Sequence, residues 1–319
     1  MKRKPQALHI LVTGGAGFIG SHVVDAYLRA GHRVTVVDNL STGKMANVNG
    51  QAQLFQDDIR SATLDAIFRQ GRFDVVCHQA AHMDLRQSVI RPWHDAEVNI
   101  LGTLNLLECA RRHAVRRVIF ASTGGAIYGD VEEYPTPESY PARPLSPYGV
   151  AKLAGEHYLH YYHAIHGLRP VILRYANVYG PRQDPHGEAG VVAIFIGRLL
   201  KGDSPVIFGD GGQTRDFVFV EDVVRANLLA LEYLGQEDPD PLAANIGTGR
   251  ELSVNELYRI VKTFTHDGPE AVYAAPKPGE QRRSAIDPSL AKRVLGWEPQ
   301  VTPEEGLGRT WDWFKERSG

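Results

Sequence analysis

The chain has 319 residues, of which 43% are hydrophobic, enough for a sizeable core in one large domain or two coupled ones. Its 35 basic and 37 acidic residues leave a net charge of −2, which gives no reason to expect nucleic acid or an anionic membrane as a partner. No apolar stretch reaches the ~18 residues that a membrane-spanning helix needs.

The chain contains two cysteines, Cys77 and Cys109, each within an apolar run. Two cysteines cannot form a disulfide framework, so we expect buried free thiols and a cytoplasmic protein. The basic residues at the start precede only a short apolar run that leads into Gly-rich sequence, which predicts a strand rather than a signal peptide.

Short apolar runs alternate with helical patterns through the first half. We predict strands at HILVT, RVTVVD, QLFQ, DVVCHQA, RVIFAS and PVILRY. The intervening helices include FIGSHVVDAYLRAGH, ended by Gly31, and the long run WHDAEVNILGTLNLLECARRH. Runs that are apolar throughout suit a parallel sheet buried on both faces. This βαβ rhythm predicts an α/β fold with a doubly wound (Rossmann) parallel sheet.

The composition changes after Tyr175. Residues 177–216 are rich in Gly, Pro and charge, with one helical run, VVAIFIGRLLKG. FVFVEDVVRANLLALEYL then indicates a strand and a helix, LAANIG a further strand, and the tail from Arg250 is mostly helical. We predict a dinucleotide-binding domain at residues 1–176 and 217–248, and a smaller mixed α/β lobe for substrate at 177–216 and 249–319.

A Gly-rich turn, TGGAGFIG, follows the first strand and opens the first helix, with glycines at 14, 17 and 20. Glycines allow a tight turn and a close approach of backbone to a pyrophosphate, and the helix N-terminus offers free N–H groups to it. Taken alone, such a turn is also an ordinary βα loop. Its position between strand and helix favours a dinucleotide.

Asp38 ends the second strand, where an acidic residue accepts hydrogen bonds from a ribose diol and repels a 2′-phosphate. No arginine follows it directly, and this favours NAD over NADP. Asp58 and Ile59 follow the third strand, where they could contact the adenine or form a simple turn.

Tyr148 and Lys152 lie four residues apart in SPYGVAK, at the start of a helix that Ser146 caps and Pro147 opens. They share one helix face. A free tyrosine has a pKa of about 10, and a nearby ammonium and a cationic nicotinamide both favour its phenolate. An amphipathic helix with a packed Tyr and a solvated Lys is the alternative, made weaker by the Gly-rich turn upstream.

These elements resemble the extended short-chain dehydrogenase/reductase superfamily over nearly the whole chain, and its bacterial UDP-glucose 4-epimerases in particular. The motifs that carry the resemblance are TGGAGFIGSH, DNLSTG, HQAA, YGP, RDFVFVEDV and NIGTG. The resemblance implies that Tyr148 is the acid/base at the sugar 4-hydroxyl and that Lys152 holds the nicotinamide ribose. The residues predicted around NAD are Gly14, Gly17, Phe18, Ile19, Gly20, Asp38, Asn39, Ser41, Thr42, Gly43, Asp58, Ile59, Gln79, Ala80, Ala81, Asn99, Tyr148, Lys152 and Tyr175.

The family also places a Ser or Thr at the end of the fifth strand as the third catalytic residue. Counting back from Tyr128 puts Gly124 at that position, whereas counting forward along the strand puts Thr123 there. The strand is the rigid element, so we predict Thr123, with Ser122 as the fallback. The resembling dehydratases and decarboxylases carry acids just after this position. Gly124 and Gly125 stand there in this chain, which favours reversible oxidation and reduction at one carbon.

On the substrate side, the resemblance places Asn177 at the diphosphate, and Arg215 suits a phosphate better than an ion pair with Asp216. In PKPGEQRRS, the phosphate could meet Lys277, Arg282 or Arg283, and Glu280 could bond the uridine ribose. Ser284, where some relatives have Tyr, leaves room for N-acetylated hexosamines. The residues predicted around the substrate are Thr123, Asn177, Val191, Val192, Arg215, Glu280, Arg283 and Ser284, with the two valines either under the uracil or in the core.

The histidines of HYLHYYHAIH lack a matching Cys or carboxylate cluster, so we predict no metal site. The stripe of Val98, Leu101, Leu104, Leu106 and Leu107 is compatible with a homodimer, as the resemblance implies, and equally with packing on the sheet.

We therefore predict a cytoplasmic enzyme that uses NAD to epimerise a UDP-hexose at C4 through a 4-keto intermediate. The alternatives are an NAD-dependent sugar-nucleotide reductase or dehydrogenase, and a UDP-glucuronate epimerase. A dinucleotide-sensing scaffold without turnover would not need Thr123, Tyr148 and Lys152 together.

Overall fold

The computed structural model describes residues 7–186, 190–265, 267–276 and 281–317. The chain divides into two compact units, each made of three segments. The first comprises Met1–Ser122, Ser146–Leu173 and Val224–Ala244, and the second comprises Thr123–Leu145, Arg174–Val223 and Asn245–Gly319. None of the described helices is long and apolar enough to cross a membrane.

The main sheet has seven strands in the order β11-β6-β5-β4-β1-β2-β3. Its pairs around β1 are parallel and in simple register, with Thr13 opposite both Val37 and His78. This confirms the predicted doubly wound α/β sheet. The strands are β1 (His9–Thr13), β2 (Arg33–Asp38), β3 (Gln53–Gln56), β4 (Val75–His78), β5 (Arg117–Thr123), β6 (Arg169–Tyr175) and β11 (Leu242–Ile246).

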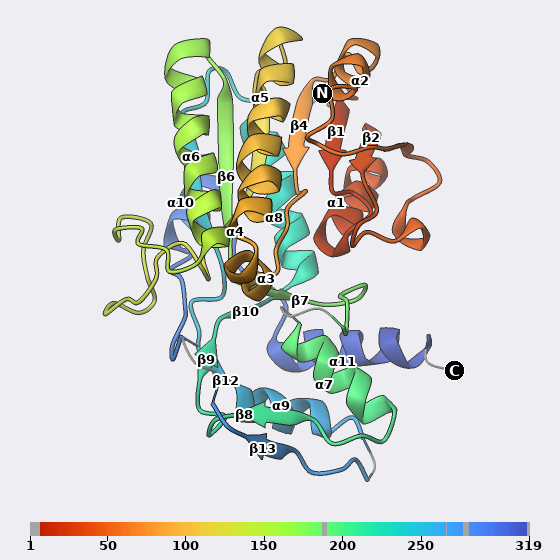
Figure 1. Cartoon of the computed structure of the whole chain (residues 1–319), viewed down its shortest axis with the longest axis vertical. Helices are drawn as coiled ribbons and strands as arrows, with labels where there is room; N and C mark the ends of the chain where they lie inside the picture. Colours follow the sequence, from red (N-terminus) through yellow and green to blue (C-terminus); the bar gives the residue numbers. More distant parts are fainter. Residues whose placement is uncertain (1–6, 187–189, 266, 277–280, 318–319) are drawn as a thin grey trace, which may run out of the picture. The chain divides into compact units, whose positions relative to one another are not determined.

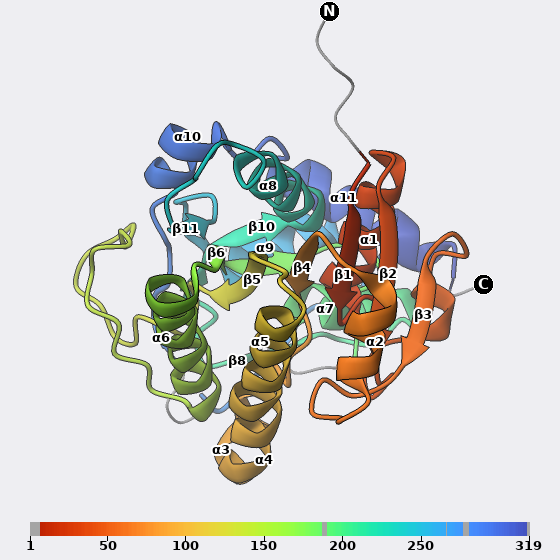
Figure 2. The ribbon, with the colours of Figure 1, turned by 90° about the horizontal axis from the view of Figure 1, so that it is seen from above.

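Helices cover both faces of this sheet, with α5 (Gly102–Arg112) and α6 (Pro147–His166) on one side and α8 (Val220–Tyr233) on the other (Figure 2). α1 (Phe18–Arg29) ends before Gly31, whose φ of +86° suits glycine. Between the sheet and α2 (Leu64–Gly71) and α5 lies a core that includes Leu11, Phe68 and Leu106, each at most 1% exposed. The short 3₁₀ helix η1 (Met45–Asn47) follows β2.

The predicted long helix of residues 93–113 is not uniform. α3 (Leu85–Ile90) is followed by α4 (Pro92–Ala96), a π-helical stretch η2 (Glu97–Leu101), and then α5. A π stretch changes the direction in which successive side chains point, and such stretches are frequent at functional sites. Leu106 and Leu107 are buried, whereas Leu101 is 56% exposed, so the apolar stripe divides between core and surface.

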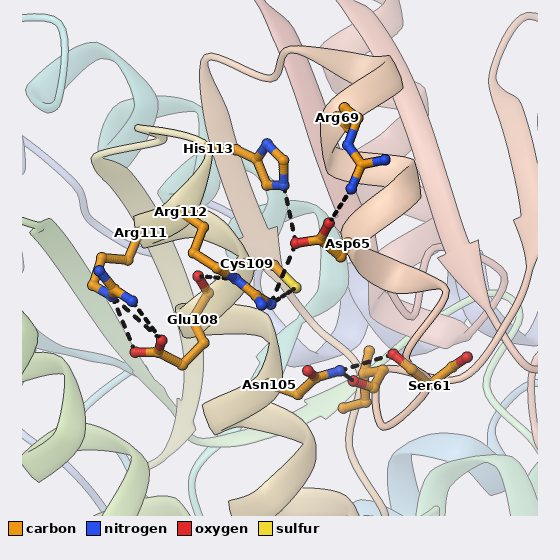
Figure 3. Close-up of polar contacts among 10 residues, drawn as sticks. Ser61, Asp65, Arg69, Asn105, Glu108, Cys109, Arg111, Arg112 and His113 are labelled. Atoms are coloured by element: carbon orange, nitrogen blue, oxygen red, sulfur yellow. Dashed lines mark hydrogen bonds and ion pairs between the residues drawn. The ribbon is translucent and has the colours of Figure 1, made fainter.

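Polar contacts tie α2 to α5 (Figure 3). The Asp65 carboxylate accepts a bond from Arg69 at 2.9 Å and lies 3.1 Å from His113 Nε2. The Asn105 amide donates to the carbonyl oxygens of Ile59 and Ser61 at 2.8 and 3.0 Å. These bonds fix the turn after β3 against α5.

The second unit is built from short strand pairs and helices. Figure 1 shows α7, α9 and α11 beside one another, and they pack together. Its elements are β7 (Asn177–Tyr179), α7 (Val191–Leu200), β8 (Val206–Phe208), β9 (Thr214–Arg215), β10 (Phe217–Phe219), β12 (Leu252–Ser253), α9 (Val254–Lys262), β13 (Val272–Ala274), α10 (Ser289–Leu295) and α11 (Pro303–Lys315). The pairs are β10–β7, β12–β9 and β13–β8. Strands of two or three residues leave no alternating pattern, which explains why most of them were not predicted.

Candidate active site

The Gly-rich turn has the conformation that its sequence predicts. Gly14 has a φ of +70°, and a Cβ there would lie 2.7 Å from the Cα of Ala80. A Cβ at Gly20 would lie 2.1 Å from the Gly14 carbonyl oxygen. The first turn of α1, which includes Phe18 and Ile19, has no side-chain cap and no acidic residue. Its N–H groups and positive dipole end are therefore available to an anion such as a pyrophosphate.

Asp38 braces this turn from the end of β2. The side chain is 7% exposed, and its two oxygens accept bonds from the backbone N–H groups of Ala16 at 2.9 Å and Leu40 at 2.8 Å. Each carboxylate oxygen retains further acceptor capacity, as a ribose diol would require. A Cβ at Gly43 would lie 2.7 Å from Asp38 Oδ1, so the turn with Asn39, Ser41 and Thr42 needs glycine there.

Asp58 is fixed by local contacts. Arg60 donates to both of its oxygens at 2.8 Å, and the Asn39 amide donates to Oδ2 at 2.8 Å. These hydrogen bonds hold the pKa of Asp58 well below its usual range. Ile59 is buried, with Gly102 packed on it. This arrangement fits both open interpretations, since a fixed turn and a wall for an adenine ring need the same rigidity.

The loop after β4 lies against the Gly-rich turn. The N–H of Gln79 donates to the Thr13 carbonyl at 3.1 Å, and that of Ala80 to the Thr13 hydroxyl at 3.3 Å. His78 is buried between the hydroxyl groups of Thr13 and Thr103, which explains this histidine as structural. Ala81 follows in the same loop and is half-buried.

Asn99, on η2, holds the next residue of this loop by both ends of its amide. Its Nδ2 donates to the His82 carbonyl at 2.8 Å, and its Oδ1 accepts from the His82 N–H at 2.9 Å. The side chain is 4% exposed. We predicted Asn99 as a contact of the cofactor; the bonds in the structure belong to the backbone of the loop that would flank it.

Tyr148 and Lys152 lie on one face of α6, whose start Ser146 caps by accepting from the Gly149 N–H at 3.1 Å. The Lys152 ammonium is 5.8 Å from the centroid of the Tyr148 ring and 4.9 Å from that of Phe120. Lys152 is 4% exposed, and burial lowers its pKa to about 8, although Asp95 and Glu156 act in the opposite direction.

The pKa of Tyr148 in the chain alone is raised, whereas a phenolate was expected for the site with its cofactor bound. In the chain alone, burial of the phenol and, to a smaller extent, the negative charge of Asp95 raise this pKa above its ordinary value. A phenolate at neutral pH therefore requires a further positive charge nearby, such as an oxidised nicotinamide would bring.

Ser122 and Thr123 end β5 with different partners. Ser122 is buried, and its hydroxyl donates to Glu156 at 2.6 Å. The Thr123 hydroxyl accepts from the Ala126 N–H at 3.2 Å. Neighbouring strand residues point to opposite faces, so only one of them can face a given ligand.

In the second unit, Gly124 packs closely on Ile286, and Gly125 lies between Thr123 and Asn177. A Cβ at Gly124 would lie 2.5 Å from Ile286, and one at Gly125 would lie 3.6 Å from Asn177 Oδ1 and 4.0 Å from Thr123 Oγ1. The structure thus brings Thr123 and Asn177 together around Gly125. Tyr175 accepts the Gly124 N–H at 2.7 Å through its carbonyl oxygen.

Asp216 shapes the surroundings of Arg215. Its carboxylate is 1% exposed and accepts from the N–H and hydroxyl of Thr248 and from the N–H groups of Gly249 and Ile286. The Arg215 guanidinium donates to the Thr214 carbonyl at 2.8 Å. Asp216 therefore organises the loops beside β9.

The remaining predicted substrate residues are spread over the second unit. Arg283 forms an ion pair with Glu251 at 2.6 Å and stacks 4.1 Å from the Tyr134 ring centroid, so its charge is already compensated. Ser284 is 7% exposed. On α7, Val192 is buried and Val191 is half-buried. Glu280 and Lys277 lie outside the described residues.

Within the described ranges, no group of three His, Cys, Asp or Glu side chains could hold a metal ion. His157, His160 and His166 are exposed on α6. Both cysteines are buried free thiols, as predicted. Sequence reasoning missed Asp95, a buried carboxylate near the Tyr148–Lys152 pair; the only signal was its spacing of four residues from Asn99.

The chain is similar in sequence to known proteins over nearly its whole length. A family model described as NAD dependent epimerase/dehydratase family matches residues 10–247. A UDP-glucose 4-epimerase of Mycolicibacterium smegmatis is 43% identical over 316 residues, which cover 98% of this chain and all of that protein.

Two solved structures are closely similar to this chain. The UDP-glucose 4-epimerase of Thermotoga maritima, solved with UDP-glucose, has a TM-score of 0.95 and 49% identity, covering 98% of this chain and 100% of that one. The UDP-glucose 4-epimerase of Thermus thermophilus, in complex with NAD, has a TM-score of 0.91 and 46% identity, covering 97% and 99%.

Proposed function

The chain belongs to the NAD-dependent epimerase/dehydratase family, and from that premise we propose that it interconverts UDP-glucose and UDP-galactose by inverting C4. The observation that carries this proposal is the buried Lys152 beneath Tyr148 on α6, in a unit that also contains the Gly14–Gly20 turn and Asp38. These are the parts that hydride transfer to and from a sugar carbon requires.

The residues present suit NAD. The turn at Gly14 and the uncapped start of α1 would hold the pyrophosphate, and Asp38 the adenosine ribose. When bound, NAD would supply the hydride-transfer chemistry at C4. Tyr148 takes the proton from O4 and gives it back, and Lys152 holds the nicotinamide ribose and supplies positive charge near the phenol.

We assign the third catalytic role to Thr123. The Ser122 hydroxyl already donates to the buried Glu156 carboxylate, whereas Thr123 lies with Asn177 around Gly125. No acidic side chain stands at positions 124 and 125 to eliminate water or assist decarboxylation. This supports epimerisation over dehydration and decarboxylation. Turnover assays distinguish the proposed epimerase from a reductase, a dehydrogenase or a UDP-glucuronate epimerase.

Asn177 and Arg215 are the proposed diphosphate contacts, with Val191 beside the uracil and Glu280 at the uridine ribose. Arg283 would reach the diphosphate only by giving up its ion pair with Glu251, and the burial of Val192 favours its place in the core. Ser284, a small residue, supports acceptance of N-acetylated hexosamines as well. Replacing Ser284 by Tyr should reduce activity on UDP-GlcNAc more than on UDP-glucose. An equal loss on both substrates would contradict this role.

We further propose a homodimer formed through α6 and the η2 region. Large apolar side chains are exposed there, and on α6 they recur at helical spacing. They are Trp93 at 77%, Leu101 at 56%, Val150 at 51%, Tyr161 at 48% and Ile165 at 64% exposure. A second copy presenting the same face would cover them with two-fold symmetry. Ile165→Glu should produce a monomer by light scattering; an unchanged mass would reject this face.

The proposal includes expectations for the domain boundaries and for the cellular compartment. The nucleotide-binding domain would comprise residues 1–176 and 217–248, and the sugar-nucleotide lobe 177–216 and 249–319. The buried free thiols of Cys77 and Cys109 fit a reducing compartment such as the cytoplasm.

The decisive experiment is turnover of UDP-, TDP- and GDP-hexoses without added reductant, followed by ion-exchange separation and absorbance at 340 nm. An equilibrium of UDP-glucose and UDP-galactose reached from both sides, without accumulation of free NADH, is the expected result. Absence of any 4-epimer rejects the proposal, and net production or consumption of NADH assigns a dehydrogenase or reductase instead.

A further inference from the structure

Asp95, on α4, is a buried carboxylate that none of the recognised motifs contains. Its side chain is 1% exposed. Oδ1 accepts a hydrogen bond from Asn99 Nδ2 at 2.9 Å and lies 3.5 Å from His82 Nδ1. Oδ2 is buried and has no hydrogen-bond partner among the residues that the structure describes. A buried, half-satisfied carboxylate is costly, and an unexplained one indicates a role beyond packing.

The surroundings of Asp95 connect it to the loop after β4. Asn99 donates from one amide nitrogen to both Asp95 Oδ1 and the His82 carbonyl, and accepts from the His82 N–H. In a regular α-helix, residues 95 and 99 are neighbours on one face. The π stretch Glu97–Leu101 begins between them, and both residues are nevertheless turned inward and joined by a hydrogen bond.

Asp95 is also buried next to the catalytic helix, since α4 and η2 both pack on α6. Its charge raises the pKa of Tyr148 and opposes the effect of burial on Lys152. The titratable groups that act on Asp95 are His82 and Lys152. Beyond them, the His94 ring centroid is 5.3 Å from that of His82, and His94 lies 3.8 Å from Glu97. Glu156 acts on Lys152, and Arg86 is the charged residue of α3, which packs on α4. In a region of low dielectric, the charge of an incompletely hydrogen-bonded carboxylate acts over a longer distance than it would in water.

We propose that Asp95 is a positioning residue of this active site, which fixes the His82 loop through Asn99 and sets the charge balance of the Tyr148–Lys152 pair. This inference rests on the proposed epimerase function. In that reaction, the O4–H bond breaks and the proton stays on Tyr148 while the 4-keto sugar turns. A negative charge nearby favours the protonated phenol during that interval and favours the ammonium of Lys152 throughout.

The test compares Asp95→Asn with Asp84→Asn in the holoenzyme. Asp84 caps α3 by accepting from the Gln87 N–H at 2.8 Å, and asparagine caps helices equally well, so this matched variant removes a charge from the same segment without removing a cap. Asp95→Asn keeps the size and the acceptor oxygen. We expect both limbs of its pH profile for kcat/KM to move to lower pH by about one unit. Asp84→Asn should leave the profile in place.

A profile of Asp95→Asn that keeps its position and only loses height would overturn the proposal, because a merely structural role lowers activity without moving either limb. If Asp95→Asn does not fold, as judged by circular dichroism, Asp95→Ser removes the same charge with a smaller polar group. It should shift the profile in the same direction.

A second readout does not depend on turnover. Ultraviolet difference titration of the holoenzyme against Tyr148→Phe isolates the ionisation of Tyr148, and the same difference is measured in the Asp95→Asn background. The phenolate should appear at lower pH when Asp95 is replaced. If the parent enzyme forms no epimer, the proposed function fails, whereas this titration still decides whether Asp95 acts on Tyr148.

Discussion

The ammonium of Lys152 donates a hydrogen bond to the backbone carbonyl of Ala121 at 2.8 Å, in the interior of the first unit. Ala121 belongs to β5 and Lys152 to α6, so the bond ties the catalytic helix to the sheet. It holds the ammonium in place while leaving donors for a further partner, since an ammonium carries three N–H groups. A lysine that were only a solvated surface residue would show neither the burial nor this bond.

Replacing Tyr148 by Phe removes the proton acceptor at O4 and leaves the ring in place. We expect kcat to fall by about 10²–10⁴-fold, the range of general acid–base catalysis. NAD content after purification should stay near the parental value, because the phenol oxygen is not the main anchor of the dinucleotide. The assay is UDP-galactose turnover, with bound NAD measured after denaturation. A variant with full activity would show that Tyr148 is not the acid/base.

The lowered pKa of Lys152 makes a signed prediction for stability. Its pKa is about 8 in the folded chain and about 10.5 in model compounds. Between these values the unfolded state binds more protons than the folded state, so this group makes stability rise as pH rises. Lys152→Met lacks that contribution. The difference in unfolding free energy between parent and variant, from urea titrations at pH 7.5 and 10, should shift in favour of the parent at the higher pH. No change in that difference would mean that the folded pKa is not lowered.

Thr123→Val and Ser122→Ala separate a catalytic from a structural hydroxyl. Thr123→Val should lower kcat by about 10²-fold with little change in stability, the lower end of the range for a group that assists proton transfer. Ser122→Ala removes the buried donor to Glu156 and should cost about 1–3 kcal/mol of unfolding free energy while kcat is mostly retained. The opposite pattern would move the catalytic role to Ser122.

Asp38→Ala should weaken NAD binding by about 10-fold or more, because a ribose diol loses charged hydrogen-bond acceptors. It should also reduce the ratio of NAD affinity to NADP affinity, since the carboxylate no longer repels a 2′-phosphate. Fluorescence titration of the cofactor-stripped enzyme with both dinucleotides measures this. Asp65→Ala, which removes a carboxylate from the contact between α2 and α5, is the control and should bind NAD as the parent does.

Asp216→Ala removes the acceptor of hydrogen bonds from Thr248, Gly249 and Ile286, all around one buried carboxylate. Leaving buried donors without a partner should cost about 3 kcal/mol of unfolding free energy. Asp210→Ala, which breaks an exposed ion pair with Arg282, is the comparison and should change stability far less. Equal effects in urea titrations would show that Asp216 does not organise these loops.

The first half of the chain carried strong local signals. β1 and β4 are buried throughout, and β2, β5 and β6 are buried at all but their first residue, so their apolar runs identified them. β3 is partly exposed. The turn at Gly14 was predictable because only glycine suits its positive φ and its 2.7 Å approach to Ala80. The short strands of the second unit were not predictable, because pairs such as Thr214–Arg215 with Leu252–Ser253 depend on contacts between distant segments.

The sequence by itself determined the sheet, the Gly-rich turn and the spacing of Tyr148 and Lys152, since each depends on residues close together in the chain. Only the tertiary structure decided that Ser122 donates to Glu156, that Asn99 holds the His82 backbone, and that Asp95 is buried beside the catalytic helix. The physical reason is that burial and long-range hydrogen bonds set the direction of a side chain and the pKa of a titratable group, and both are properties of the folded surroundings rather than of a local pattern.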